Sequence, residues 1–403
     1  MAGTEAGGGA LDGLVVLELG SFIAGPFAGQ LLGDLGADVI KVEPPGAGDP
    51  MRGYRTVGGR SMWWPGIARN KRSVAIDLRD ERGRDIVRRL AGRCDVVLEN
   101  FRPGLVAEWG LDHATLAATN PGVILTHVSG YGQTGPRAAE PGFGSIGEAV
   151  GGLRHVTGDP DRPPARAGIS LGDSLAAVFA VIGTLAALQE RGRSGRGQEV
   201  DVAIYEAVMA VMESTVADYE LGGEIRGRTG GILPGVAPSN AYPCADGKDV
   251  VVAANADPIF VRLAAAMDRP ELAADARYRD FAARAAHQGE LDAEIVAWTT
   301  SLPHDVVLAR LQHHAVPVGL INAAPDLAVD PHVAAREMIL RLAAPGFDRL
   351  VPMTGVVPKL SRTPGAVRNV GPALGEHTDA VLRELAAVTD DELAALRAAG
   401  VVA

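Results

Sequence analysis

The chain has 403 residues, enough for more than one domain, and 47% of them are hydrophobic, which is ample for a core and argues against a disordered chain. Its formal net charge is −11 at pH 7, so a general affinity for nucleic acid is not expected. The two cysteines, Cys94 and Cys244, stand far apart and form neither a disulfide framework nor a paired-cysteine metal site. No apolar run approaches the roughly 20 residues that span a bilayer. We therefore expect a soluble cytoplasmic protein whose glycine-rich start, residues 1–10, is frayed and is not a signal peptide.

Strand and helix patterns alternate along the first half of the chain. Residues 14–19 form an apolar run typical of a buried strand, and a turn follows in which Pro26 favours the start of a helix that ends at Gly36. The expected strands after that helix cover 38–42, 73–78, 95–99, 123–128 and 199–204, with a helix over 81–91. This alternation predicts an α/β fold with a doubly wound parallel sheet.

Residues that break helices and strands cluster near position 225, and the pattern changes there. A strand is expected over 249–254, and helices over 259–267, 281–286 and 291–300. Short strands within 346–364 and helices over 379–385 and 391–399 follow. We assign 1–225 to a large α/β domain, 226–324 to a smaller α+β domain, and 325–403 to a segment that returns to the large domain.

The most informative chemical signal is Asp173, which stands just ahead of a long apolar helix. At or near an N-cap its carboxylate can accept hydrogen bonds from exposed backbone N–H groups, and the helix dipole favours its ionised form. A fixed, ionised carboxylate is either a helix cap or a nucleophile toward an activated carbonyl. The residue taken alone leaves both interpretations open.

Other polar segments also have two interpretations. The turn at residues 20–25 lacks the G-x-G-x-x-G spacing of a nicotinamide-binding turn, which argues against a dehydrogenase. Lys71 and Arg72 precede a strand and are either phosphate-binding cations or a solvated charge pair. Tyr131 and Gln133 follow the carboxyl end of a strand, where ligands of open α/β sheets bind, and are either ligand contacts or turn residues. No metal site is expected, because the histidines lack carboxylates at metal-binding spacing.

In their order and spacing these segments resemble the class III CoA-transferases, the formyl-CoA transferase family that also contains α-methylacyl-CoA racemases. The resemblance extends from Gly13 to His377. The segments that carry it are 24–26, 32–43, 70–73, 99–104, 130–136, 172–173 and 195–198. It implies a Rossmann-like large domain with a smaller domain, and an interlocked, ring-like homodimer.

The resemblance also implies the chemistry. Asp173 is the expected nucleophile, which attacks an acyl-CoA thioester to give a mixed anhydride and then an aspartyl-CoA thioester. CoA or acyl-CoA is a substrate, and no tightly bound cofactor is expected. The implied CoA contacts, with Lys71 and Arg72 at the phosphates, are Ser21, Phe22, Ile23, Ala24, Lys71, Arg72, Asn100, Arg102, Tyr131, Gln133 and Phe143. The implied substrate and loop residues, the loop being the glycine-rich stretch 227–235, are Gly144, Arg166, Arg228, Gly230 and Gly231.

Departures from the family pattern reduce the number of reactions that the resemblance allows. Racemases carry a histidine, needed for α-proton exchange, at the position of Phe143, so its absence favours acyl transfer. Formyl-CoA transferases place glutamine near Ile23 and a Tyr-Glu pair near Phe143-Gly144, and both are missing.

The segments 142–149 and 237–240 are most similar to branches that use succinyl-CoA and C4–C5 dicarboxylates such as malate, citramalate, itaconate or mesaconate. Arg154, Arg166 and Arg228 are each either a partner for the second carboxylate or a solvated charge. The alternatives are an acyl-CoA racemase or isomerase with Asp173 as base, a formyl-CoA-type transferase, and a CoA-binding regulator.

Overall fold

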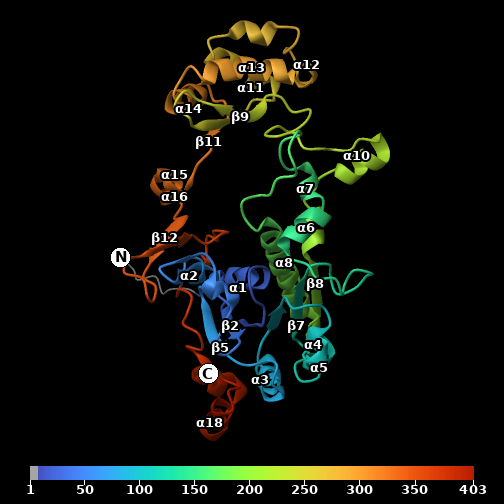
Figure 1. Ribbon diagram of the computed structural model, residues 1–403, viewed down its shortest axis with the longest axis vertical. Coiled ribbons are helices and arrows are strands. Elements are labelled where there is room, and N and C mark those ends of the chain that lie inside the picture. Colours follow the sequence, from blue (N-terminus) through green and yellow to red (C-terminus); the bar gives the residue numbers. More distant parts are fainter. Residues whose placement is uncertain (1–7) are drawn as a thin grey trace. The chain divides into compact units, whose positions relative to one another are not determined.

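The computed structural model describes residues 8–403, so most of the start that was expected to be frayed, residues 1–7, lies outside the described part. The chain divides into two compact units (Figure 1). Unit 1 consists of Met1–Leu153, Ala167–Ser214 and Ala334–Ala403, and unit 2 consists of Arg154–Arg166 and Thr215–Val333. The second unit therefore begins before the predicted boundary at 225 and ends after 324, and it takes in an earlier segment that the sequence pattern did not separate.

A six-stranded parallel sheet forms the centre of unit 1, as the alternating pattern predicts. Its strands are β1 (Val15–Glu18), β2 (Asp38–Glu43), β5 (Lys71–Ala75), β6 (Val96–Glu99), β7 (Ile124–Ser129) and β8 (Glu199–Ala203). They lie in the order β5-β2-β1-β6-β7-β8, which is the strand order of the Rossmann fold. The order reverses between β1 and β6, and ligands of such sheets bind outside the carboxyl ends of the strands at this point.

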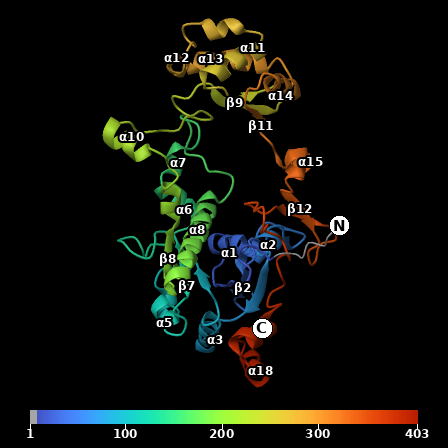
Figure 2. The same cartoon turned by 180° about the vertical axis from the view of Figure 1, so that it is seen from behind.

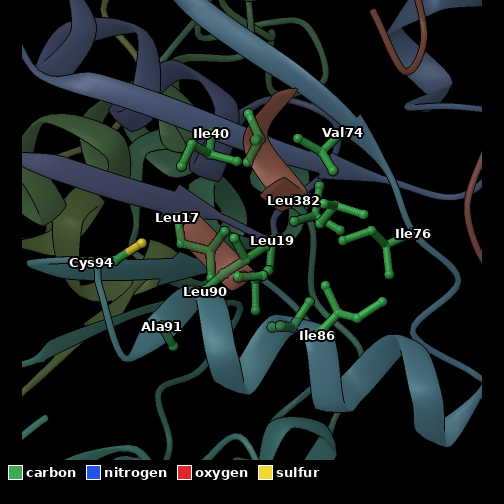
Figure 3. Close-up of a cluster of buried hydrophobic side chains, with 14 of the residues drawn as sticks. Leu17, Leu19, Ile40, Val74, Ile76, Ile86, Leu90, Ala91, Cys94 and Leu382 are labelled. Carbon is green, nitrogen blue, oxygen red and sulfur yellow. The ribbon is translucent and has the colours of Figure 1, made fainter. Parts of the chain in front are cut away.

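Helices cover both faces of the sheet. On one face lie α3 (Glu81–Ala91), α17 (Thr378–Ala386) and α18 (Asp390–Ala398). Figure 3 shows the buried cluster between them, in which Leu17 and Ile40 of the sheet pack with Leu90 of α3 and Leu382 of α17. The last 25 or so residues of the chain therefore complete the core of the domain that the first residues begin.

The opposite face is covered by α1 (Ala24–Asp34), α8 (Leu171–Ser194) and α9 (Ile204–Met209). Figure 2 shows α1 beside α8, and small residues such as Ala176, Ala177 and Ala180 let α8 approach the sheet closely. By length and composition α8 is apolar enough to cross a membrane, which corrects the expectation that no such run exists. One side of α8 packs against β7, β8 and α1, while Val178 and Ile182 are exposed.

Short elements connect this framework. Those of unit 1 are η1 (Pro50–Gly53), β3 (Thr56–Val57), β4 (Arg60–Ser61), α2 (Trp64–Ile67), α4 (Leu105–Glu108), α5 (His113–Ala117), α6 (Gly144–Val150), β12 (Ile339–Leu342) and β13 (Val351–Thr354). The sequence pattern did not predict α6, whose glycine-rich heptamer has weak helical signals. This helix begins beside the candidate site.

Unit 2 is the α+β body that the sequence predicts. A three-stranded antiparallel sheet, in the order β11-β10-β9, packs against helices around a core that includes Tyr242, Phe260 and Leu291. Its elements are α10 (Thr215–Gly222), β9 (Ser239–Pro243), β10 (Asp249–Ala253), α11 (Asp257–Ala266), η2 (Pro270–Ala274), α12 (Phe281–Ala286), α13 (Gln288–Thr299), α14 (His304–His313), β11 (Val318–Leu320) and α15 (Ala324–Val329). The elements α7 (Leu153–Val156) and α16 (Pro331–Ala335) include the residues where the chain passes between the units.

His127 is buried in β7 between two carboxylates. Its Nδ1 lies 2.5 Å from Glu99 Oε1, and its Nε2 lies 3.4 Å from Glu199 Oε1. Burial disfavours the charged imidazolium, but Glu99 and Glu199 outweigh that effect and raise the pKa of His127. The other oxygen of Glu99 accepts a hydrogen bond from Phe101 N at 2.6 Å, so this buried pair also supports the loop that follows β6.

The raised pKa of His127 predicts a pH-dependent contribution to stability. A group whose pKa is raised on folding contributes stability that is fully present below its unfolded pKa, about 6.5, and lost as pH rises through the folded pKa. The difference in the free energy of unfolding between the wild type and His127→Gln is expected to be greatest in acid and to fall as the pH rises. The total fall is about 1.4 kcal/mol for each pH unit by which folding raises the pKa of His127. Urea unfolding across neutral pH measures it, with exposed His332→Gln as the control. A difference that does not vary with pH contradicts the expectation.

Candidate active site

A cavity of about 540 Å³ opens at the carboxyl ends of the strands in unit 1, at the point where the strand order reverses. Its walls come from the turn after β1, the loop after β6, the loop after β7 and the start of α8. The predicted site residues that line it are Ser21, Phe22, Ile23, Ala24, Asn100, Arg102, Phe143 and Asp173. The fold thus brings together side chains that are spread over 150 positions of the sequence.

Asp173 lies in the first turn of α8 and is half-buried. The N-cap residue is Ser170, so Asp173 lies near the N-cap, in the first turn of the helix, as the sequence predicts. The carboxylate remains close to the positive end of the helix dipole, which favours its charged form. Ser170 occupies the cap position, and Asp173 is one of the residues that line the cavity.

Two glycines hold this carboxylate against the start of α6. A Cβ atom on Gly144 would lie 2.3 Å from Asp173 Oδ2, and a Cβ on Gly172 would lie 2.9 Å from the Gly144 carbonyl oxygen. The N-cap residue of α6 is Phe143, whose side chain cannot accept a hydrogen bond. The start of α6 therefore lies beside the Asp173 carboxylate without a cap from the Phe143 side chain, and Gly144 is required by this close approach. Glu148, fully buried on α6, accepts a hydrogen bond from Gly172 N at 3.3 Å and ties the two helices together.

Lys71 and Arg72, the predicted phosphate contacts, have carboxylate partners within the fold. Lys71 is buried, and its Nζ lies 2.7 Å from Glu18 Oε2 and 2.7 Å from the Pro26 carbonyl oxygen. Burial lowers the pKa of Lys71 to about 8, although Glu18 opposes the shift. Arg72 is paired with Asp38 and Glu384. Both cations begin β5, whereas the cavity lies at the carboxyl ends of the strands.

Tyr131 and Gln133 lie outside the lining of the cavity, so their predicted ligand contacts are not supported. The Tyr131 hydroxyl accepts a hydrogen bond from Arg137 Nη2 at 2.6 Å, and the Arg137 guanidinium lies 4.1 Å from the centre of its ring. Gln133 N donates to Asp201 Oδ2 at 2.8 Å. The contacts of this loop therefore favour the interpretation of Tyr131 and Gln133 as turn residues.

Arg166, Arg228, Gly230 and Gly231 belong to unit 2. Within that unit Arg228 Nε donates to the Asp159 carbonyl oxygen at 3.2 Å, and Gly230 N donates to the Gly158 carbonyl oxygen at 3.0 Å. A Cβ on Gly231 would lie 2.8 Å from Asn240 Oδ1. The glycine-rich stretch is thus held by the 158–160 loop and β9, and its role toward a substrate stays a prediction.

A second cavity, of about 420 Å³, adjoins the first and shares Ser21 and Phe101 with it. It lies beyond the carboxyl ends of β1, β2 and β5, and its lining includes Asp77 and the exposed Arg79. Arg79 was not predicted from the sequence as a site residue, although its position directly after a predicted strand could have indicated it. Within residues 8–403 no group of three or more His, Cys, Asp and Glu side chains is arranged to hold a metal ion.

The comparisons with known proteins agree with this geometry. The model of CoA-transferase family III matches residues 11–378. The chain is 55% identical to the succinyl-CoA–D-citramalate CoA-transferase of Chloroflexus aurantiacus, over 97% of this chain and 98% of that one.

It is also 41% identical to the alpha subunit of succinyl-CoA–L-malate CoA-transferase of Chloroflexus aurantiacus, over 97% of this chain and 92% of that one. The crystal structure of a CaiB/BaiF family protein from Brucella suis superimposes with a TM-score of 0.83 and 35% identity, over 94% of this chain and all of that one. A match along nearly the whole chain, together with a carboxylate-lined cavity at the switch point of a Rossmann-type sheet, shows that the chain belongs to CoA-transferase family III.

Proposed function

We propose that this protein transfers CoA from succinyl-CoA to a C4–C5 dicarboxylic acid, with citramalate as the first candidate acceptor. The observation that carries the proposal is Asp173, whose half-buried carboxylate lines the cavity and is held against the start of α6. The acceptor is suggested by the relatives, which are named for citramalate and malate. Phe143 supports transfer over racemisation, because its ring cannot exchange a proton.

The reaction follows from a carboxylate nucleophile. Asp173 attacks the thioester carbonyl, the C–S bond breaks, and CoA thiolate leaves a succinyl–aspartyl anhydride. The thiolate then attacks the aspartyl carbonyl of the anhydride, which releases succinate and leaves an aspartyl-CoA thioester. The acceptor carboxylate repeats these two steps in reverse and departs as the new thioester, which restores Asp173 without net proton transfer. The N–H groups that begin α6 are suited to stabilise the oxyanion of each step.

The two adjoining cavities suggest a path for the long CoA molecule. In this proposal the thioester end lies beside Asp173, and the chain passes Ser21 and Phe101 toward the second cavity. Arg79 and Arg102 are exposed at the walls, where they pair with Asp77 and Glu108, and in this proposal they exchange those partners for the phosphates of CoA. A reducing cytoplasmic location is part of the proposal, since both cysteines are buried and free.

A homodimer is also part of the proposal. Apolar side chains stand exposed on three helices that contact one another, and they include Ile146 of α6, Val178 and Ile182 of α8, and Met209 of α9. Val178 and Ile182 are four residues apart and therefore share one face of α8. An exposed apolar face of this kind is typical of a surface that a second copy covers, and the interlocked arrangement implied by the family resemblance would cover it.

The proposed function is tested by an assay of CoA transfer. Purified protein is incubated with succinyl-CoA and a panel of citramalate, malate, itaconate, mesaconate and glutarate, and new CoA thioesters are followed by mass spectrometry. We expect a new thioester with at least one acceptor, and a fall in kcat of about 10³-fold or more for Asp173→Asn, which removes the nucleophile. Glu190→Gln, in the same helix, is the control. Absence of transfer, with solvent deuterium entering the α-carbon of an acyl-CoA, contradicts the proposal and favours a racemase.

The glycine contact at the nucleophile gives a second prediction. Gly144→Ala places a methyl group where the Asp173 carboxylate lies, so the carboxylate must move, and a displacement of about 1 Å is expected to lower kcat about 100-fold. Steady-state kinetics and thermal unfolding separate this effect from loss of the fold. The control is Gly192→Ala in α8, where no atom lies within 4 Å of the added methyl. Wild-type kcat in Gly144→Ala would show that the contact has no catalytic role.

The association is tested by light scattering after size-exclusion chromatography. The wild type is expected to have twice the chain mass of 41.7 kDa. Ile182→Lys, which puts a charge on the exposed apolar face of α8, is expected to shift the mass toward that of one chain. Val261→Lys, on an exposed position of α11 in unit 2, is the control and is expected to leave the mass unchanged. A wild-type mass of one chain contradicts the proposed dimer.

A further inference from the structure

The turn formed by residues 20–22, directly after β1, lines both cavities, and side chains from other elements hold its backbone at every step. Lys41 Nζ donates to the Gly20 carbonyl oxygen at 2.9 Å. Asn100 accepts from Ser21 N and donates to the Ser21 carbonyl oxygen, both at 2.8 Å. Phe22 N donates to Asp49 Oδ1 at 3.3 Å. The conformation of this turn is therefore set by three side chains outside it.

Two of those side chains form a buried ion pair. Lys41 Nζ lies 2.8 Å from Asp49 Oδ2 and 2.9 Å from Glu18 Oε1, and all three residues are buried. Asp49 Oδ1 also accepts a hydrogen bond from Met51 N at 2.8 Å. Burial disfavours the ammonium, but Glu18, Asp49 and Glu43 outweigh it and raise the pKa of Lys41. The Lys41 ammonium that holds the turn is therefore charged throughout the neutral pH range.

The turn they hold is strained at Phe22. Its φ is +65°, in the left-handed region that costs a residue with a side chain of this size free energy. The ring gains little burial in return, because Phe22 is 44% exposed. It packs edge to face with Phe143, with the ring centres 6.4 Å apart, and Phe143 is itself 66% exposed. Two exposed aromatic side chains and a strained backbone thus face the cavity that Asp173 lines.

We propose that Lys41 and Asp49 are positioning residues for CoA transfer, which hold Phe22 in its strained conformation so that Phe22 and Phe143 form an aromatic wall for the acyl end of the thioester. This inference rests on the proposed function. Aromatic rings pack against the methylene carbons of a dicarboxylate and exclude water beside Asp173, where an anhydride would otherwise be hydrolysed. The ion pair acts through the backbone of Phe22 and does not touch the substrate.

The first test removes the aromatic ring and the strain together. Phe22→Gly adopts a positive φ without strain, so we expect an unchanged or higher Tm, together with a fall in kcat/KM for succinyl-CoA of about 10-fold or more and increased succinyl-CoA hydrolysis. Phe281→Ala, which removes an equally exposed ring (44%) from unit 2, is the control and is expected to leave kcat/KM unchanged. Wild-type kcat/KM and hydrolysis in Phe22→Gly would overturn the proposal. These variants keep the ion pair intact, so they test the aromatic wall even if the ion-pair variant does not fold.

The second test asks whether the ion pair acts through Phe22. Asp49→Asn removes the charge that faces Lys41, and we expect kcat to fall about 10-fold in the wild-type background and to change little further in the Phe22→Gly background. The matched control is Asp34→Asn, which breaks the equally buried Asp34–Arg69 pair outside the cavity lining, and is expected to lower Tm but leave kcat unchanged.

The positioning role would be overturned if the losses in kcat of the two single variants multiply in the double variant. It would also be overturned if Asp49→Asn lowers Tm but leaves kcat at the wild-type value. Failure of the proposed function is distinguished from failure of the positioning role by the wild type itself, because the wild type would then transfer no CoA to any acceptor.

Discussion

The buried charges beneath the first turn of the sheet are the constraint on which the site depends. Lys41 lies between Glu18 and Asp49, while Lys71 pairs with Glu18 and Arg52 pairs with Glu43. A buried ion pair is costly unless further hydrogen bonds satisfy its polar atoms. Each cation here donates to a backbone carbonyl as well, and the acceptors are Gly20, Pro26 and Pro372. The cluster therefore fixes the backbone of three distant segments, among them the turn that lines both cavities.

Asp173, the proposed nucleophile, is placed by a different physical feature, the close approach of two helices at glycines. Gly144 and Gly172 let the starts of α6 and α8 meet, and this contact puts the Asp173 carboxylate beside the first residue of α6. The charged cluster and the glycine contact act on different segments that line the same cavity. In the proposed mechanism they provide a fixed carboxylate, donors for a developing oxyanion, and an aromatic surface that keeps water away.

The sequence was sufficient to predict the parts of the fold that depend on local pattern. Alternating apolar strands and helices gave the parallel sheet, and the carboxylate before a long apolar helix gave Asp173. It was insufficient where pairing between distant residues decides the outcome. Lys71 and Arg72 look like a phosphate site because their charges are visible in the sequence, but Glu18 and Asp38, more than thirty positions earlier, take up those charges. The hydrogen bond from Arg137 to Tyr131 and the buried Glu148 were equally invisible, since burial and partners appear only in the folded chain.

The central claim of this account is covalent catalysis by Asp173, and trapping the intermediate tests it most directly. The protein is mixed with succinyl-CoA and then treated with hydroxylamine, which attacks activated acyl groups but not free carboxylates. Peptide mass mapping then locates the modification. The account predicts a hydroxamate on Asp173 that depends on succinyl-CoA and is absent without it. A protein that transfers CoA but acquires no hydroxamate at Asp173, or acquires it at another carboxylate, would contradict the account.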